Sequence, residues 1–267
     1  TGFFGSVPGG LLKGVGRGYT DFTAALISAG LGKARVLEMQ VWKEVDGILT
    51  ADPRRVPNAR VLPLITPEEA AELTYFGSEV LHPLTMERVV TADVPIRIKN
   101  TFKPEEPGTE IRASDNQDWA VTAITAKRGI VMATIHSNRM YDAHGFLARV
   151  FGVLQHHQVV VDLVSTSEVS ISFTVQWVSD IERPLADLQQ LGSVEFRPNR
   201  AILACVGAGM KDTPGMSGKM FSTLGQEDIN IEMISQGASE INISCVIKEE
   251  DVERALRAVH RTFLETP

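Results

Sequence analysis

The sequence predicts an α/β protein in which a layered region of strands and helices precedes two smaller β-α-β-β-α units of the ferredoxin-like type. Helix and strand signals alternate over roughly the first hundred residues, which favours an α/β layer fold. The remainder contains an internal repeat, and each copy has the element order of a split βαβ unit. The length of 267 residues is typical of two or three domains.

The layered region opens with a helix expected over 21–31, with Thr20 or Asp21 near its cap. A buried strand is expected over 36–42. Thr66, Pro67 and Gly77 then predict the N-cap, first residue and end of a further helix.

The rest of that region is expected to contain a helix over 83–93 and the strand "VPIRIKNT". The segment 103–117 is rich in proline, glycine and charge, so it is interpreted as a linker.

The repeat is visible in matched positions of its two copies. Each copy predicts a strand, a polar loop, a helix, two strands joined by a turn, and a final helix. The matched residues are Gly145 with Gly215, Phe151 with Phe221, Leu154 with Leu224, Asp162 with Glu232, and Ser167-Glu168 with Ser239-Glu240.

Composition narrows the functional classes. The net charge of −7 and the pI near 5.4 argue against nucleic acid or an anionic membrane as the main partner. Cys205 and Cys245 lie in apolar segments and are expected to be buried thiols of a reducing compartment.

The opening "TGFFGSVPGG" has no basic n-region and no run of about 18 apolar residues follows, so a cytoplasmic setting is expected. Because "TGFF" is typical of the end of a buried strand, we expect the start of a domain to precede it.

The stretch "GVGRGYTD" has the features of an anion-binding turn at a helix start. Its glycines allow close approach of the backbone, Arg17 suits a carboxylate, and Asp21 suits an ammonium group. Together they favour an amino-acid zwitterion over a bare phosphate. The alternative is a simple strand-to-helix turn with an Arg–Asp surface pair.

A second candidate is the loop "WKEVDGILTADPR", which follows a buried strand. Loops at the carboxyl ends of strands in open α/β sheets are the usual ligand positions. Lys43 and Arg54 suit nucleotide phosphates, and Glu44 suits a ribose or base. The alternative is a solvated turn in which "DG" and "DPR" only set the backbone geometry.

Each repeat also predicts a small-molecule cleft. In the first copy, the backbone amides of Gly145, Phe146 and Leu147 suit a carboxylate, and Asp162 suits an amine. The second copy offers Asp212, Gly215, Met216 and Gln236 in matching places. The alternative is that these residues only cap helices and turns. No zinc-ligand spacing, Ser-His-Asp arrangement or P-loop pattern is recognisable.

Several long motifs resemble the aspartate kinase family: "GRGYTD", "WKEVDGILTADPR", "PNARVLPLITPEEAAELTYFGSEVLHP" and "VPIRIKNTFKPEEPGTEI". The later "GFLARVF", "VDLVSTSEVSISF" and "ISQGASEINIS" resemble the family's tandem ACT domains. The residues of these motifs are most similar to those of fungal members. The resemblance implies part of an amino-acid kinase (carbamate-kinase-like) sheet followed by two ACT domains. It also implies transfer of the ATP γ-phosphate to the β-carboxylate of L-aspartate with Mg²⁺, the first step toward lysine, threonine and methionine.

The resemblance also implies the site residues. The aspartate substrate would contact Arg17, Thr20 and Asp21, and ADP would contact Lys43, Glu44, Leu49 and Arg54. The effector positions would be Met140, Gly145, Phe146, Leu147, Val161, Asp162 and Ser167, joined by Gln236 of the second copy.

The implied domains are a kinase part over 1–113, a first ACT domain over 129–195, and a second ACT domain formed by 119–128 with 196–267. Two positions depart from bacterial members: Leu49 replaces a tyrosine, and Glu79 replaces a lysine on the phosphate side, for which Lys99 is a substitute. The lysine-bearing "KFGGTS"-type motif is also absent from these 267 residues. Because phosphoryl transfer depends on charge stabilisation, we expect this chain alone to phosphorylate aspartate poorly.

Two other functions remain open at this stage: a non-catalytic amino-acid-binding regulatory module that acts through dimerisation, and a kinase for another amino acid such as glutamate. The tandem repeats argue against the latter. Threonine is favoured over lysine as effector because the resemblance is fungal. Pairing through ACT edges predicts a homodimer or a larger assembly.

Overall fold

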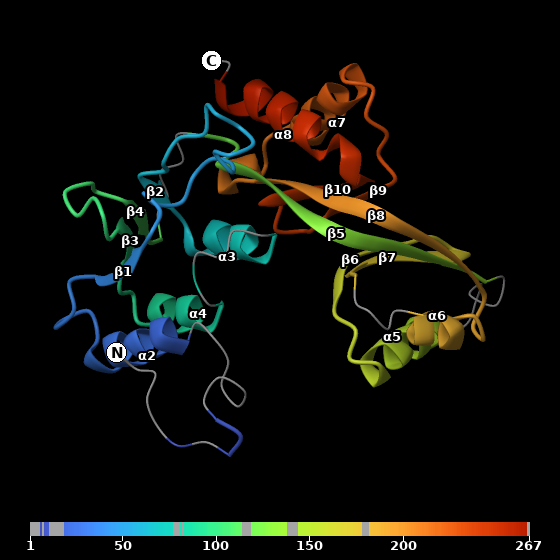
Figure 1. Cartoon of the computed structure of the whole chain (residues 1–267), viewed down its shortest axis with the longest axis horizontal. Coiled ribbons are helices and arrows are strands. Elements are labelled where there is room, and N and C mark those ends of the chain that lie inside the picture. The colour runs from blue at the N-terminus through green and yellow to red at the C-terminus, as the bar shows by residue number, and fades with distance from the viewer. Residues whose placement is uncertain are drawn as a thin grey trace.

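The computed structural model describes residues 6, 8–10, 19–76, 81, 83–113, 119–137, 144–177 and 182–265. Residues 19–113, here called the first region, form a small sheet with three helices at one side of the molecule (Figure 1). The remainder forms a six-stranded sheet flanked by helices at the other side. Arg17, Glu79 and Met140 lie outside the described residues.

The sheet of the first region has the order β1-β3-β4-β2. Its strands are β1 (Met39–Lys43), β2 (Leu64–Ile65), β3 (Ile96–Asn100) and β4 (Thr109–Ile111). Strand β1 runs parallel to β3, β4 pairs antiparallel with β3, and β2 runs parallel to β4. The prediction of a linker over 103–117 is therefore wrong at β4, which the sheet uses to join β3 to β2. Its short length and the surrounding prolines conceal it in the sequence.

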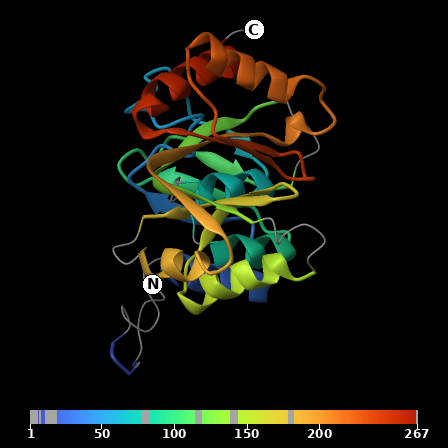
Figure 2. The ribbon, with the colours of Figure 1, turned by 90° about the vertical axis from the view of Figure 1, so that its right-hand side faces the viewer.

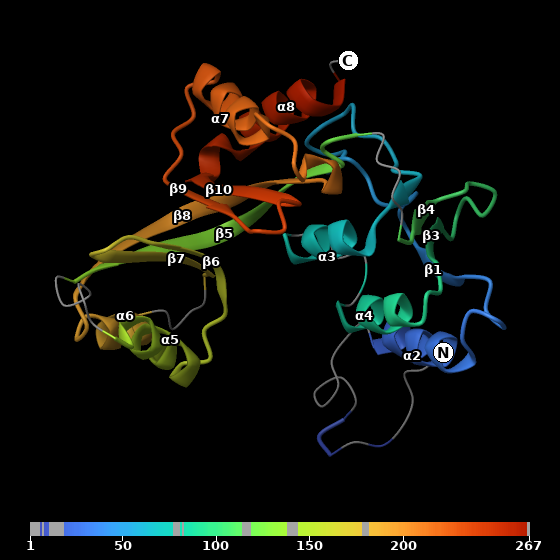
Figure 3. The ribbon, with the colours of Figure 1, turned by 180° about the vertical axis from the view of Figure 1, so that it is seen from behind.

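Among the described residues, three helices accompany this sheet. Helix α2 (Tyr19–Leu31) lies beside α4 (Pro83–Thr91), and α3 (Pro67–Tyr75) lies between them and the larger sheet (Figures 1 and 3). Helix α2 begins two residues earlier than predicted, so Thr20 and Asp21 lie in its first turn rather than at its cap.

The predicted start of α3 is confirmed. The Thr66 hydroxyl accepts a hydrogen bond from the Glu69 amide (3.2 Å), and the Glu69 carboxylate accepts one from the Thr66 amide (2.8 Å). This reciprocal capping box satisfies two backbone donors that a helix start otherwise leaves unpaired.

The larger sheet has the order β6-β7-β5-β8-β10-β9. Its strands are β5 (Ala123–His136), β6 (Val161–Thr166), β7 (Ser170–Gln176), β8 (Ser193–Val206), β9 (Met233–Gln236) and β10 (Asn242–Lys248). The long strands β5 and β8 pair antiparallel with a register shift between Lys127 and Ile130. Before this shift β5 lies beside the part of β8 that pairs with β10, and after it β5 also pairs with β7. Both repeats therefore share β5 and β8.

Two helices accompany each repeat, as the sequence predicts. Helices α5 (Phe146–His156) and α6 (Glu182–Leu188) belong to the first repeat, and α7 (Met216–Gln226) and α8 (Val252–His260) to the second. Viewed from the side, the two pairs lie below and above the strands (Figure 2). Short turns of helix cover Ala208–Met210, Glu249–Asp251 and Arg261–Glu265. Gly145 and Gly215 occupy the matched N-cap positions of α5 and α7 with φ of 80° and 87°.

Helix α3 joins the first region to both repeats. The Glu69 carboxylate, 2% exposed as a residue, accepts hydrogen bonds from the Thr122 hydroxyl (2.6 Å) and the Ala208 amide (2.8 Å). Glu72 accepts one from the Asn242 amide group (2.7 Å). Buried polar groups are tolerable only when they are paired, so these contacts fix the position of α3.

The C-terminal end of α3 contributes to a small apolar cluster on the larger sheet. Phe76, 3% exposed, packs there with side chains from β5, β6, β8, β9 and β10: Ile130, Met132, Leu163, Ile202, Ala204, Met233 and Val246. The edge strands β6 and β9 approach each other around this cluster. The larger sheet is thus curved, and the first region fills part of its interior.

A further prediction concerns the burial of the two cysteines. Cys205 and Cys245 are buried free thiols on β8 and β10, as predicted, and burial raises the pKa of Cys245 to about 12. Within the described part of the chain, no helix combines the length and apolar character needed to cross a bilayer.

Candidate nucleotide and amino-acid site

The loop that follows β1 lines a cavity of about 660 Å³. This volume lies within the range of roughly 300–1,000 Å³ that is usual for small-molecule sites. The opposite wall comes from the start of β5, from Leu73 of α3 and from Leu256 of α8. The four residues predicted to contact ADP all line it: Lys43, Glu44, Leu49 and Arg54.

The shape of this loop depends on Gly47, which has φ of 146°. A Cβ atom at this position would lie 2.4 Å from the Thr109 hydroxyl oxygen. That hydroxyl donates to the Leu62 carbonyl (2.6 Å) and accepts from the Ile48 amide (2.8 Å), so it has little freedom to move. The "DG" pair therefore sets the backbone geometry, as the alternative interpretation of this loop, a turn shaped by these residues, also expects.

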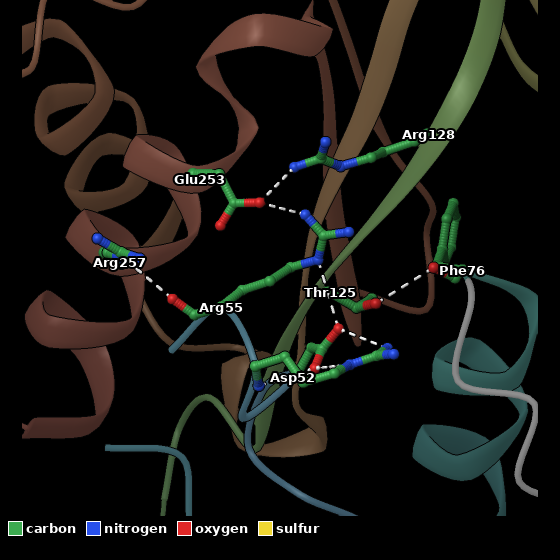
Figure 4. Close-up of polar contacts among 8 residues, drawn as sticks. Asp52, Arg55, Phe76, Thr125, Arg128, Glu253 and Arg257 are labelled. Carbon is green, nitrogen blue, oxygen red and sulfur yellow. Dashed lines mark hydrogen bonds and ion pairs between the residues drawn. The ribbon is translucent and has the colours of Figure 1, made fainter. Parts of the chain in front are cut away.

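The second half of the loop is organised by Asp52. Its carboxylate accepts two bonds from the Arg54 guanidinium (2.9 and 3.0 Å) and one from the Arg54 amide (3.0 Å). Arg55 approaches the same carboxylate at 3.3 Å (Figure 4). The hydrogen bonds from Arg54 hold the pKa of Asp52 below its usual range. Arg54 remains 87% exposed, so its guanidinium reaches solvent while Asp52 orients it.

The predicted substrate and nucleotide residues meet in one ion pair. Asp21, in the first turn of α2, places a carboxylate oxygen 3.6 Å from the Lys43 ammonium nitrogen at the end of β1. Both side chains are partly buried, and Thr20 beside them is exposed. The fold therefore brings two sequence motifs together at one edge of the cavity.

The predicted effector residues that the structure describes lie at four places. Gly145, Phe146 and Leu147 form the start of α5, where Phe146 is buried and Leu147 is 42% exposed. Val161 and Asp162 begin β6. The remaining two occupy strand ends: Ser167 pairs with the Ser170 hydroxyl (2.7 Å) in the β6–β7 turn, and Gln236 ends β9 opposite Ile243.

Asp162 already has protein partners. Its side chain is 2% exposed, and one carboxylate oxygen lies 2.6 Å from the Lys127 ammonium nitrogen and 3.3 Å from the Tyr75 hydroxyl. The other oxygen is buried and has no hydrogen-bond partner among the described residues. Burial, reinforced by Asp162, raises the pKa of Tyr75 to about 12.

Sequence reasoning did not find Lys127 and Tyr75, because they come from β5 and α3. No local pattern marks either as a neighbour of β6.

The described residues contain no group of three or more histidine, cysteine, aspartate or glutamate side chains that could hold a metal ion. Mg²⁺ in kinase sites is usually held by one or two carboxylates together with substrate phosphates. A nucleotide-borne Mg²⁺ is therefore compatible with the residues around this cavity, among which Glu44 and Asp52 carry carboxylates.

Comparisons with known proteins agree with this architecture. The model of the amino acid kinase family matches residues 1–100, and an ACT domain model matches residues 134–182 and 203–263. The aspartokinase of Schizosaccharomyces pombe is 50% identical over 292 aligned residues, covering 99% of this chain. That of Candida albicans is 49% identical, again over 99% of this chain. The chain is therefore similar to aspartokinases along nearly its whole length. It spans 56% and 54% of the length of these two relatives, slightly more than half.

Solved aspartate kinases share the fold. The Clostridium acetobutylicum enzyme superposes with a TM-score of 0.85 at 32% identity, covering 92% of this chain and 58% of that one. Escherichia coli aspartokinase III in complex with aspartate and ADP gives 0.81 at 33% identity, covering 94% and 56%. The same enzyme with lysine and aspartate gives 0.81 at 34% identity, covering 93% and 56%. The predicted fold class, an amino-acid kinase sheet with two ACT domains, is thereby confirmed.

Proposed function

We propose that this chain carries the nucleotide- and aspartate-binding groups of an aspartate kinase, which transfers the ATP γ-phosphate to the β-carboxylate of L-aspartate. The observation that carries the proposal is the Asp21–Lys43 pair, because it joins the predicted substrate residues to a cavity lined by the predicted nucleotide residues. The related E. coli enzyme has been solved with aspartate and ADP, the two ligands that this arrangement requires.

Each side chain has a role that suits its chemistry. Lys43 and Arg54 offer positive charge to phosphate oxygens, Glu44 accepts hydrogen bonds from a ribose or base, and Leu49 provides apolar contact. Asp21 accepts from the substrate ammonium, and Arg17 is proposed for its carboxylate. Bound Mg²⁺ supplies further positive charge at the phosphates.

Isothermal titration with ADP and with aspartate tests this function. We expect Lys43→Met to weaken ADP binding about tenfold or more, the loss expected for one hydrogen bond to a charged group. Lys33→Met is the matched control, because Lys33 is exposed and pairs with Asp93 away from the cavity. Asp21→Asn should weaken aspartate binding. An unmodified chain that binds effector but neither ADP nor aspartate would instead support a non-catalytic regulatory module.

Turnover is a separate measurement. The "KFGGTS"-type motif does not occur in these 267 residues, so we expect the chain alone to phosphorylate aspartate poorly in the presence of ATP and Mg²⁺. Robust turnover would contradict this part of the proposal.

For the ACT pair we propose an amino-acid effector at the first repeat, with threonine favoured over lysine. The unpartnered buried oxygen of Asp162 supports a site for an ammonium group there. The related E. coli enzyme has been solved with lysine, so a thermal-shift comparison of both amino acids is the direct test. A melting temperature raised by lysine and unchanged by threonine would reverse the preference.

We also propose that the ACT pair mediates assembly into a homodimer or larger oligomer, as ACT edges do in the family. Sedimentation equilibrium measures this directly, and a monomer at all concentrations would contradict it.

A further inference from the structure

The cavity loop packs on the second ACT repeat. Ala51 and Val56 are buried in the same apolar cluster as Leu256 and Val259 of α8, and not in the core of the first region. The Thr50 carbonyl also accepts a hydrogen bond from the Ile124 amide of β5. Tertiary contacts of residues 50–56 are therefore made largely with the regulatory part of the chain.

Polar contacts from α8 and the turn after it reinforce this packing. The buried His260 ring lies 3.0 Å from the Thr50 hydroxyl on one side and 2.7 Å from a Glu265 oxygen on the other. The other Glu265 oxygen accepts from the Asn58 side chain (2.8 Å). Arg257 donates to the Arg55 carbonyl (2.8 Å).

One residue of α8 reaches a side chain that lines the cavity. A single Glu253 oxygen accepts from the guanidinium groups of both Arg55 and Arg128, the latter at 2.7 Å (Figure 4). Arg55 in turn pairs with Asp52. Arg55 and Asp52 line the cavity, whereas Glu253 and Arg128 do not line it.

We propose that Glu253 is a positioning residue for the nucleotide, so that α8 of the second ACT repeat is part of the nucleotide site. This inference rests on the proposed function of the cavity. The Arg55 guanidinium is shared between two carboxylates, those of Glu253 and Asp52. Without it, Arg55 has Asp52 as its remaining carboxylate partner, and the pair presents a different charge arrangement to a phosphate. Nucleotide affinity thus depends on a helix that does not belong to the kinase part.

Titration of ADP into Glu253→Gln tests the inference, because glutamine keeps the size of the side chain and removes its charge. We expect ADP affinity to fall about threefold to fivefold, the effect of losing one partly exposed ion pair. Glu250→Gln is the matched control: Glu250 is 75% exposed at its side chain and pairs with Lys248 beyond the cavity. Aspartate affinity should remain unchanged in both variants.

A double-mutant cycle separates positioning from general destabilisation. If Glu253 acts through Arg55, then Glu253→Gln has no further effect on ADP affinity in an Arg55→Ala background. Equal ADP affinity in Glu253→Gln and the unmodified chain, or an undiminished effect in the Arg55→Ala background, overturns the inference while the proposed function stands. Failure of the unmodified chain to bind ADP overturns both.

Discussion

The two ACT repeats place an acidic residue at the same matched position but surround it differently. Asp162 in the first repeat is 2% exposed at its side chain and pairs with Lys127 of β5. Glu232 in the second is 5% exposed and pairs with two arginines of β8, Arg200 at 2.9 Å and Arg197 at 3.3 Å. Each acid therefore faces one of the two long strands that the repeats share.

The difference lies in the contact with α3. Tyr75 donates to Asp162, and the neighbouring Phe76 fills the apolar cluster between the edge strands. Glu232 is neutralised by residues of the larger sheet itself. The two nearly symmetric repeats therefore differ in this respect. The buried acid of the first repeat belongs to the junction with the first region, and that of the second pairs within the larger sheet.

The largest expected effect comes from removing the side chain that joins the two parts. Phe76→Ala should destabilise the protein by about 3–5 kcal/mol, the usual cost of truncating a buried phenylalanine. Urea denaturation measures it. Phe151→Ala is the control, because Phe151 of α5 is 37% exposed and should cost clearly less. Equal losses would show that the junction cluster contributes no more than a half-exposed surface side chain.

The acidic positions can be compared by removing a cation from each. Lys127→Ala leaves Asp162 with Tyr75 as its remaining polar partner in the structure, whereas Arg200→Ala leaves Glu232 paired with Arg197. Because an unpaired buried charge is costly, we expect a loss of about 2–4 kcal/mol for Lys127→Ala and about half of that for Arg200→Ala. Denaturation of both variants under identical conditions decides it, and the opposite order would reject the asymmetry.

Where the repeats share local geometry, matched substitutions should behave alike. Gly145→Ala and Gly215→Ala each place a side chain at φ near 80–90° with no atom within 4 Å of the added Cβ, so backbone strain alone should act. We expect each to lower stability by about 1–2 kcal/mol. A Cβ atom added at Gly152 within α5 also meets no atom. Gly152→Ala lowers the conformational entropy of the unfolded chain, so it should stabilise the protein by about 0.5–1 kcal/mol. Melting temperatures that fall by different amounts in the two N-cap variants would contradict this expectation and show that the two helix starts differ even without a bound ligand.

A small loss of stability is expected for Tyr75→Phe, about 0.5–1.5 kcal/mol for one hydrogen bond. Its signature is a dependence on pH. The pKa of Tyr75 is raised from 10.0 to about 12 in the folded protein, so the folded state holds this proton more tightly than the unfolded state does. The resulting stabilisation is complete below pH 10 and is lost as the pH rises through 12. The stability difference between the unmodified protein and Tyr75→Phe should shrink over this interval, and a constant difference would contradict the assignment.

Local sequence signals determined a large part of this molecule. The capping box at Thr66 and Glu69, the N-cap glycines of both repeats and the β-α-β-β-α order follow from residues a few positions apart, and the structure has all of them. Strand β4 was missed because its three residues are too few to carry a periodic pattern. The motifs around Asp21 and Lys43 could each be recognised in the sequence, but nothing local indicated that they contact each other.

Tertiary structure decided which of these pieces meet. It brings Asp21 to Lys43, Tyr75 to Asp162, and Glu253 to Arg55. Such contacts arise from the burial of apolar faces far apart in the chain, a collective effect that no spacing of a few residues encodes. The sequence therefore determined the elements and the chemical groups they carry. Only the packing of the whole chain decided that α8 of the second ACT repeat contacts the cavity loop, and that the end of α3 contacts the first repeat.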